Sequence, residues 1–188
     1  MPGDYSGGAT VDISRNLNVQ TYSGTLLPSL RANNSGKTLT LIGGGAVNGF
    51  IECRDGGILI CSIDVLGSVS ARVDGSKLVL RDCYVEANSA QGAIQLYDVF
   101  GGFDFQMRNC RIRAIGVDAP AVYVQSTVGS STFILENSIL EANGTGESIE
   151  ATSAVTMDIA NVFANSAVNS NVTQRISTVS VNSNVRAL

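Results

Sequence analysis

Three stretches of the chain repeat one pattern of apolar positions at intervals of 27 and 28 residues. Each copy begins with two apolar residues separated by one residue, as at Leu78 and Leu80. Three residues later a second apolar series starts on the opposite parity, as at Cys83 and Val85. The matching positions in the other copies are Phe105, Met107, Cys110 and Ile112, then Phe133, Leu135, Ser138 and Leu140. Alternation with a period of two predicts β-strands.

A single straight strand cannot place both Leu80 and Cys83 inside, because successive side chains of a strand point to opposite faces. One extra residue must therefore turn the chain between the two apolar pairs. That residue is Asp82, Asn109 or Asn137 in the three copies. Asp and Asn adopt the left-handed conformation more readily than other non-glycine residues. Each copy thus predicts a strand, a one-residue corner and a second strand that faces the same interior.

A third strand is predicted in each copy, because the segments 92–98, 120–126 and 147–153 align through their apolar positions. Three strands and three corners describe one coil of a parallel β-helix, whose coils stack about 4.8 Å apart. Further coils are expected to start at Leu39, Ile58 and Met157, with Ser62 and Asn161 at corners in the last two. The predicted fold is therefore all-β, a single-stranded parallel β-helix of about six coils.

The ends of such a stack must be covered, because unpaired strand edges promote polymerisation. The pattern divides the chain into an N-terminal arm or cap (1–36), the β-helix (37–165) and a C-terminal last coil or cap (166–188).

Composition excludes several classes of partner. Charged residues make up 15% of the chain, the net charge is −4, and no cluster of Lys and Arg occurs, so no nucleic acid is expected as a partner. No apolar run approaches the roughly 20 residues that span a bilayer, and the N-terminus lacks the basic and apolar regions of a signal peptide. The four cysteines form no CxxC pair and the chain has no His, so we expect no metal site and no cofactor.

Two rows of aligned residues are candidates for chemistry. Glu86, Arg113 and Glu141 are expected in an outward row of alternating charge, where the central Arg argues against an acid and base pair. Inward, Cys83 is expected next to Cys110. The two thiols are either a redox pair, since adjacent coils bring their Cα atoms within disulfide range, or small buried core residues. We prefer the second interpretation.

The coil pattern, with its Asx corners and inward columns of Ile, Val, Leu and Cys, resembles the right-handed parallel β-helices of the pectin-lyase-like superfamily. That group includes polysaccharide lyases, galacturonases and phage tailspikes. The resemblance covers roughly residues 37–165 and implies a right-handed β-helix. It extends to no catalytic motif, because the chain lacks the His and the Arg-x-Lys of galacturonases and shows no calcium-loop spacing. We therefore expect no enzymatic activity and no catalytic residues.

Outward apolar and aromatic residues indicate a subunit interface or a ligand surface. These residues are Val79, Tyr84, Tyr123, Ile134 and Ile139. An exposed apolar stripe on a weakly charged solenoid favours an oligomer, and tyrosines also stack on sugars. Loops at 88–92, 115–120 and 143–147 fall at one corner and offer a second surface for a receptor or glycan.

In proteins that resemble this one, a short β-helix without catalytic residues is most often a component of a virus particle. The resemblance thus implies a homotrimeric capsid decoration (cement) protein that stabilises a phage head, in contact with the major capsid protein or other virion proteins. Its location would be the virion, assembled in the host cytoplasm. The alternatives are a phage tail fibre or tailspike that binds a receptor such as a host surface glycan, and a carbohydrate-active or carbohydrate-binding module.

Overall fold

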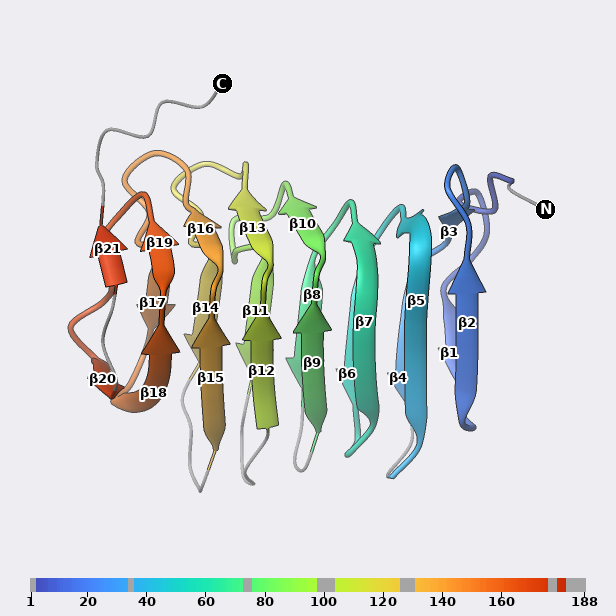
Figure 1. Cartoon of the computed structure of the whole chain (residues 1–188), viewed down its shortest axis with the longest axis horizontal. Helices are drawn as coiled ribbons and strands as arrows, with labels where there is room; N and C mark the ends of the chain where they lie inside the picture. Colours follow the sequence, from blue (N-terminus) through green and yellow to red (C-terminus); the bar gives the residue numbers. More distant parts are fainter. Residues whose placement is uncertain are drawn as a thin grey trace.

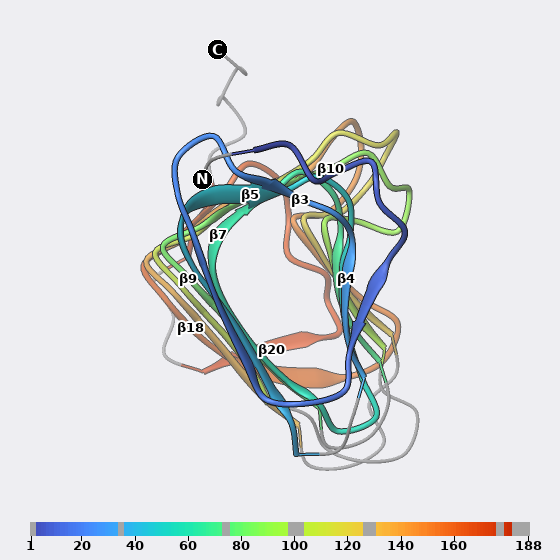
Figure 2. The same ribbon diagram turned by 90° about the vertical axis from the view of Figure 1, so that its right-hand side faces the viewer.

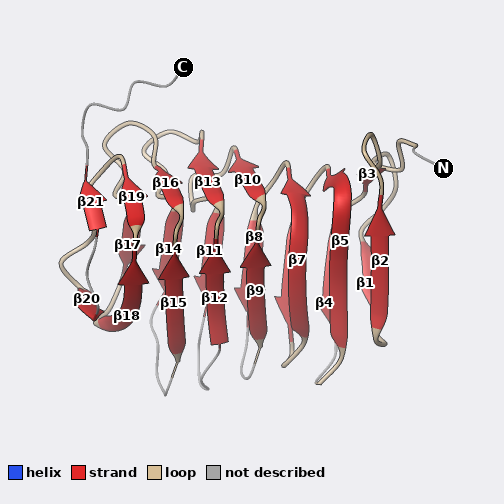
Figure 3. Ribbon diagram, in the orientation of Figure 1, coloured by secondary structure: helices blue, strands red, loops and turns tan. Residues whose placement is uncertain are grey.

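The computed structural model of the chain is all-β (Figures 1 and 3). It describes residues 3–33, 36–72, 76–97, 104–125, 131–175 and 179–181. Within these ranges the chain forms strands and turns and no helix, as the sequence predicts. Every strand pair in them is parallel, and the two sheets curl strongly around a common interior (Figure 2). This arrangement is compatible with a β-helix or solenoid.

The strands fall into three series, which recur in the same order along the chain. The first series contains β2 (Leu17–Thr21), β5 (Thr38–Val47), β7 (Ile58–Val65), β9 (Lys77–Arg81), β12 (Asp104–Arg108), β15 (Thr132–Glu136), β18 (Val155–Ala160) and β20 (Val172–Arg175). The second series contains β3 (Leu26–Leu27), the ends of β5 and β7, β10 (Tyr84–Ala87), β13 (Arg111–Ala114), β16 (Ile139–Glu141), β19 (Val162–Ala164) and β21 (Val179–Val181). The third series contains β1 (Val11–Ile13), β4 (Leu30–Asn33), β6 (Ile51–Arg54), β8 (Val69–Arg72), β11 (Ile94–Tyr97), β14 (Val122–Gln125) and β17 (Ile149–Ala151).

The register of the strands stacks equivalent residues of successive copies. Phe105 pairs with Leu78 on one side and with Phe133 on the other, and Val85 pairs with Ile112. The side chains of all five are at most 3% exposed. The apolar core is thus a set of columns that run perpendicular to the strands, and the alignment predicted for the three copies is confirmed.

The corner residues adopt the left-handed conformation. The φ angles of Asp82, Asn109, Asn137 and Asn161 are 51°, 54°, 48° and 54°. The side-chain amide of Asn109 donates a hydrogen bond to Asp82 Oδ1 (3.0 Å), and that of Asn161 donates to Asn137 Oδ1 (3.1 Å). Asp82, Asn109 and Asn137 also donate their backbone N–H groups to the next coil, as Asp82 N–H does to the Arg108 carbonyl (3.1 Å). The corners therefore stack as the strands do.

The expected corner at Ser62 is wrong. Ser62 lies inside the continuous strand β7, whose buried residues Leu59, Cys61, Ile63 and Val65 keep a strict alternation. One residue separates Cys61 from Ile63, so no change of parity requires a left-handed corner there.

The neighbouring strand β5 turns at glycines instead. The register between β5 and β7 shifts between Ile42 and Ala46, a β-bulge that contains Gly43 at φ 123°. A Cβ atom on Gly43 would lie 2.0 Å from the Thr21 carbonyl oxygen, so only glycine fits at this position.

Strand pairing continues beyond both ends of the 37–165 segment. Strands β2 and β3 pair with β5, and β4 pairs with β6, so residues 17–33 lengthen the stack on the N-terminal side. On the C-terminal side β20 pairs with β18, and β21 pairs with β19. The last residues of the predicted C-terminal segment, 182–188, lie outside the described part of the chain.

We predict that the corner at Asn109 is conformationally specific. The Asn109→Ala variant should lower the free energy of unfolding by about 1–2 kcal/mol, because alanine is strained in the left-handed conformation. The Asn109→Gly variant loses the same side-chain hydrogen bond without that strain and serves as the control. Urea denaturation followed by circular dichroism measures both; equal stability of the two variants would contradict the role of the corner.

Candidate functional site

The outward side chains of the three series form three faces, which we call the first, second and third face. The residues predicted for one interface stripe are divided among them. Val79 and Ile134 lie on strands of the first face, Tyr84 and Ile139 on the second, and Tyr123 on the third. No single partner surface in the described structure contains all five.

The first face carries an apolar patch, which consists of Ile58, Ile60, Val79 and Ile134. Val79 pairs with Ile60 and with Gln106, and Gln106 pairs with Ile134, so three members stand in one row. Ile58, Ile60 and Ile134 are half-buried, whereas Val79 is only 3% exposed. The expectation that Val79 is exposed is therefore corrected: its neighbours in adjacent strands already cover this short side chain.

Ion pairs flank this patch within the first face. Lys77 Nζ lies 2.7 Å from Asp104 Oδ2, and Arg108 Nε lies 2.8 Å from Glu136 Oε2. All four side chains are between 31% and 45% exposed, so each pair contributes at most about 1 kcal/mol to stability. Their effect is to surround the apolar patch with charge.

The second face carries the charged row predicted from the sequence. Glu86 pairs in register with Arg113, and Arg113 with Glu141. Arg113 Nη1 lies 3.0 Å from Glu86 Oε2, and the Tyr84 hydroxyl donates a hydrogen bond to the same carboxylate. Glu141 accepts two hydrogen bonds from Arg111, at 3.0 Å from Nε and 2.8 Å from Nη2. The predicted row is thus correct in register, but its Glu141 end is held by Arg111.

A groove of about 770 Å³ also lies on the second face. Tyr84, Arg111 and Ile139, which share one row across β10, β13 and β16, line one side of it. The groove is further lined by Asp64, by the corner residues Asp82, Asn109 and Asn137, and by Cys83 and Cys110.

The expected loop surface is built from hydrogen bonds between loops. The Asn143 amide donates to the Ile115 and Gly116 carbonyls (both 3.1 Å), and Thr145 donates its N–H and its hydroxyl to Asp118 Oδ1 (both 2.8 Å). These two bonds lower the pKa of the Asp118 carboxyl below its usual value. The loops at 115–120 and 143–147 therefore stack on each other.

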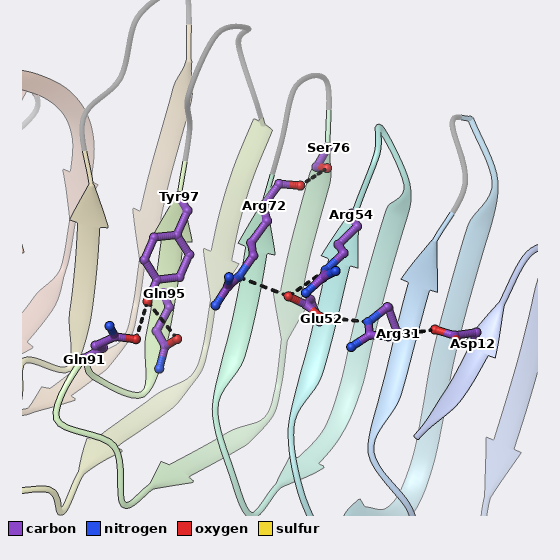
Figure 4. Close-up of polar contacts among 9 residues, drawn as sticks. All are labelled: Asp12, Arg31, Glu52, Arg54, Arg72, Ser76, Gln91, Gln95 and Tyr97. Carbon is purple, nitrogen blue, oxygen red and sulfur yellow. Dashed lines mark hydrogen bonds and ion pairs between the residues drawn. The ribbon is translucent and has the colours of Figure 1, made fainter. Parts of the chain in front are cut away.

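The third face holds the strongest concentration of charge that the structure describes, which we call the arginine cluster (Figure 4). It consists of Glu52 and the three arginines that contact its carboxylate, Arg31, Arg54 and Arg72. Their Nε atoms lie 2.8, 2.8 and 3.1 Å from the nearest Glu52 oxygens. The Glu52 side chain is 5% exposed, and a hollow of about 260 Å³ lies over the cluster. Arg31 also reaches Asp12, at 3.3 Å.

The electrostatics of Glu52 follow from its surroundings. Burial by itself would raise the pKa of this carboxyl, but the ion pair with Arg54 and the hydrogen bond from Arg31 outweigh burial and lower the pKa below its usual value of 4.5. The carboxylate therefore stays charged at neutral pH and fixes the positions of three guanidinium groups.

Aromatic residues continue the third face beyond the cluster. The Arg72 guanidinium lies 4.6 Å from the centroid of the Tyr97 ring, and the Tyr97 and Tyr123 rings meet edge to face at 6.1 Å. The Tyr97 hydroxyl donates to Gln91 Oε1 (2.7 Å) and also approaches Gln95 Oε1 (3.1 Å) (Figure 4). Tyr123 is thus the one predicted surface residue that lies beside this group.

The sequence analysis missed the arginine cluster, although a signal for it exists. The third strand was aligned only for the longer coils. Segment 51–54 pairs in register with 69–72, and 69–72 pairs in register with β11, which places Arg54, Arg72 and Tyr97 in one row. An alignment of these shorter segments with residues 94–97 would have found that row.

The described ranges contain no group of three or more His, Cys, Asp or Glu side chains arranged to hold a metal ion. They also contain no helix long and apolar enough to cross a membrane.

Comparisons of this chain with protein-family models, with curated proteins and with solved structures find no match. The resemblance to pectin-lyase-like β-helices therefore rests on the coil pattern and on the parallel strands alone.

We predict that Glu52 organises the third face. Replacement of Glu52 by Gln should lower the free energy of unfolding at pH 7 by about 1–3 kcal/mol, because three guanidinium groups lose a charged acceptor. The matched control is Glu136→Gln, which removes a half-exposed pair and should cost at most about 1 kcal/mol. Denaturant unfolding measures both variants, and an equal effect would contradict the assigned role.

The stability difference between the parent chain and the Glu52→Gln variant should also depend on pH. The pKa of Glu52 is lower in the folded chain than in the unfolded chain, so its contribution is present above pH 4.5 and is lost as the pH falls through the folded pKa. The difference in stability between the parent chain and Glu52→Gln should therefore shrink in acid.

Proposed function

We propose that this chain is a right-handed parallel β-helix that acts as a structural protein of a virus particle, a homotrimeric decoration protein on the outside of a capsid. The observation that supports the proposal best is the uninterrupted in-register pairing of the first series from β2 to β20. Hydrogen bonds in such a stack all run along one axis, and the core columns run beside them. The stack of coils is therefore short and stiff, as suits a protein that stabilises a capsid.

The handedness and the coil number belong to this proposal. A connection between parallel strands of one sheet is right-handed in about 98% of cases, so we infer a right-handed β-helix. The first series has eight strands, and we assign one coil to each, against the six expected from the sequence. Eight coils at about 4.8 Å per coil give a column roughly 35 Å long.

The apolar patch on the first face supports self-association. Isoleucine side chains that stay partly exposed on a sheet favour contact with a second apolar surface, and a symmetric trimer supplies one from each neighbouring copy. The flanking Lys77–Asp104 and Arg108–Glu136 pairs would form the polar rim of that interface. The coat protein, or another virion protein, would then contact a different face or an end of the column.

The test compares virus particles that lack the protein with particles to which it is added back. Particles without it should be less stable to heat yet adsorb to cells normally. A tail fibre would give the opposite result, with adsorption lost and heads intact, and that result would overturn the decoration role.

Two variants test whether the apolar patch itself, rather than any exposed isoleucine, is needed for the trimer. Ile60→Lys places a charge in the apolar patch and should give monomers by light scattering, with no restoration of heat stability. The control is Ile139→Lys, which changes an isoleucine 40% exposed on the second face and should leave the trimer intact. A parent chain that is monomeric at all concentrations would exclude the trimer.

The third face favours a second candidate function, the binding of an acidic carbohydrate. An aromatic ring offers a stacking surface for a sugar, and Tyr97 stands between the arginine cluster and Tyr123. An arginine that contacts Glu52 through Nε retains two Nη groups, which are suited to a sugar carboxylate or sulfate. This candidate would make the chain a receptor-binding or carbohydrate-binding module.

Titration calorimetry with acidic and neutral oligosaccharides tests this second candidate. We predict binding of the acidic series only, weakened at least about tenfold by Arg54→Ala, in keeping with the loss of one charge-assisted contact. Affinity should also fall as salt is added. Arg108→Ala on the first face is the control and should bind as the parent chain does; equal binding of neutral sugars would contradict the role of the arginines.

A further inference from the structure

Cys83 and Cys110 are held together by the two corners that precede them. Each cysteine directly follows a corner residue, Asp82 or Asn109, and directly precedes the paired residues Tyr84 and Arg111. Their Sγ atoms lie 3.4 Å apart, and both thiols are free. Neighbouring in-register parallel strands are about 4.8 Å apart, which lies within the 4.4–6.8 Å range of Cα separations in disulfides.

These two residues differ from the other two cysteines in their access to solvent. Cys83 and Cys110 line the groove on the second face and are 5% and 3% exposed, so a small molecule that enters the groove comes close to the pair. Cys53 and Cys61 are 0% exposed and do not line the groove. Burial raises the pKa of Cys53 to about 11 and that of Cys61 to about 12. The chain thus contains two inert thiols as internal references.

The hydrogen bonds around the pair distinguish its two sulfurs. The Cys110 thiol donates to the Arg108 carbonyl (3.1 Å), so the hydrogen between the two sulfurs comes from Cys83. A hydrogen bond from Cys83 stabilises a thiolate at Cys110 and lowers its pKa, although burial opposes this. The same contact, together with burial, raises the pKa of Cys83. Cys110 is therefore the better nucleophile of the two.

We propose that Cys83 and Cys110 are an oxidisable dithiol, which a small peroxide entering the groove converts to a disulfide that joins two successive coils. The Cys110 thiolate attacks one peroxide oxygen, the O–O bond breaks, and hydroxide leaves, so that Cys110 becomes a sulfenic acid. The Cys83 sulfur then attacks Cys110 Sγ, the S–S bond forms, and the sulfenic oxygen leaves as water. In total two thiols and one hydrogen peroxide give one disulfide and two waters, with two electrons passed from sulfur to peroxide.

The bond would act along the stacking direction, in which hydrogen bonds also hold the coils together. It closes a loop between residues 27 apart in the sequence, and so prevents separation of β10 from β13 at their first residues. This inference is independent of the proposed virion role, because it depends on the groove and on the two sulfurs alone.

The experiment treats the native, fully reduced full-length chain with about one equivalent of hydrogen peroxide. Remaining thiols are then blocked with N-ethylmaleimide under denaturing conditions, and the peptides are identified by mass spectrometry. The expected result is a Cys83–Cys110 disulfide, with Cys53 and Cys61 recovered as blocked thiols. The absence of this disulfide, or oxidation of Cys53 and Cys61 at the same rate, would overturn the proposal. In urea the selectivity should disappear, because the fold creates it.

Single variants test the order of the two steps. In Cys83→Ser the sulfenic acid at Cys110 has no resolving partner and should be trapped by dimedone. In Cys110→Ser trapping at Cys83 should be at least about tenfold lower, because the pKa of Cys83 is raised and little of its thiol is ionised. Cys61→Ser is the matched control and should form the disulfide as the parent chain does. Equal trapping in the two groove variants would refute the assignment of Cys110 as the attacking sulfur.

Discussion

The later coils depend on one backbone constraint, the left-handed conformation of a single Asx residue between two of their strands, at Asp82, Asn109, Asn137 and Asn161. In a straight strand the side chains of Leu80 and Cys83 would point to opposite faces, so Cys83 would face solvent. At φ of 51° Asp82 turns the chain so that Leu80 is 0% exposed and Cys83 is 5% exposed. Once one coil has this shape, the next coil pairs with it in register, and its own corner is placed by the same contacts. The core columns, the stacked corners and the outward rows all follow from that repetition.

Repetition also determines where chemistry is possible. Apolar columns fill most of the interior, and the ion pairs lie on the three outward faces. Each face presents the side chains of a different position of the repeat. The first face combines isoleucines with flanking ion pairs, the second contains the groove over the corners, and the third carries Glu52 with its three arginines. Self-association, thiol chemistry and ligand binding would therefore occupy separate surfaces, which do not compete.

The sequence predicts what depends on periodicity and misses what depends on neighbours. The stacking of Leu78, Phe105 and Phe133 follows from spacing alone, and so does the turn at Asp82. The low exposure of Val79 could not be predicted, because it results from side chains on adjacent strands. Ser62 was misplaced because a corner was expected in every coil, whereas β7 runs straight through that position.

The ends of the chain and the third face also contain features that depend on neighbouring strands and not on periodicity. Strands β2 to β4 lack the Asx corner that marks the later copies, so their place in the stack became apparent only from their pairing with β5 and β6. The cluster around Glu52 combines residues from three coils, on strands β4, β6 and β8. No single strand carries the whole cluster, and only the register brings Arg31, Glu52 and Arg72 together.

A crystal structure of the chain is the most direct measurement of the corner. The account predicts that the side chains of Leu80 and Cys83 enter one interior, with Asn109 left-handed directly beside Asp82 in the neighbouring coil. Side chains of Leu80 and Cys83 on opposite faces of one straight strand, or antiparallel pairing of residues 84–87 with 111–114, would contradict it.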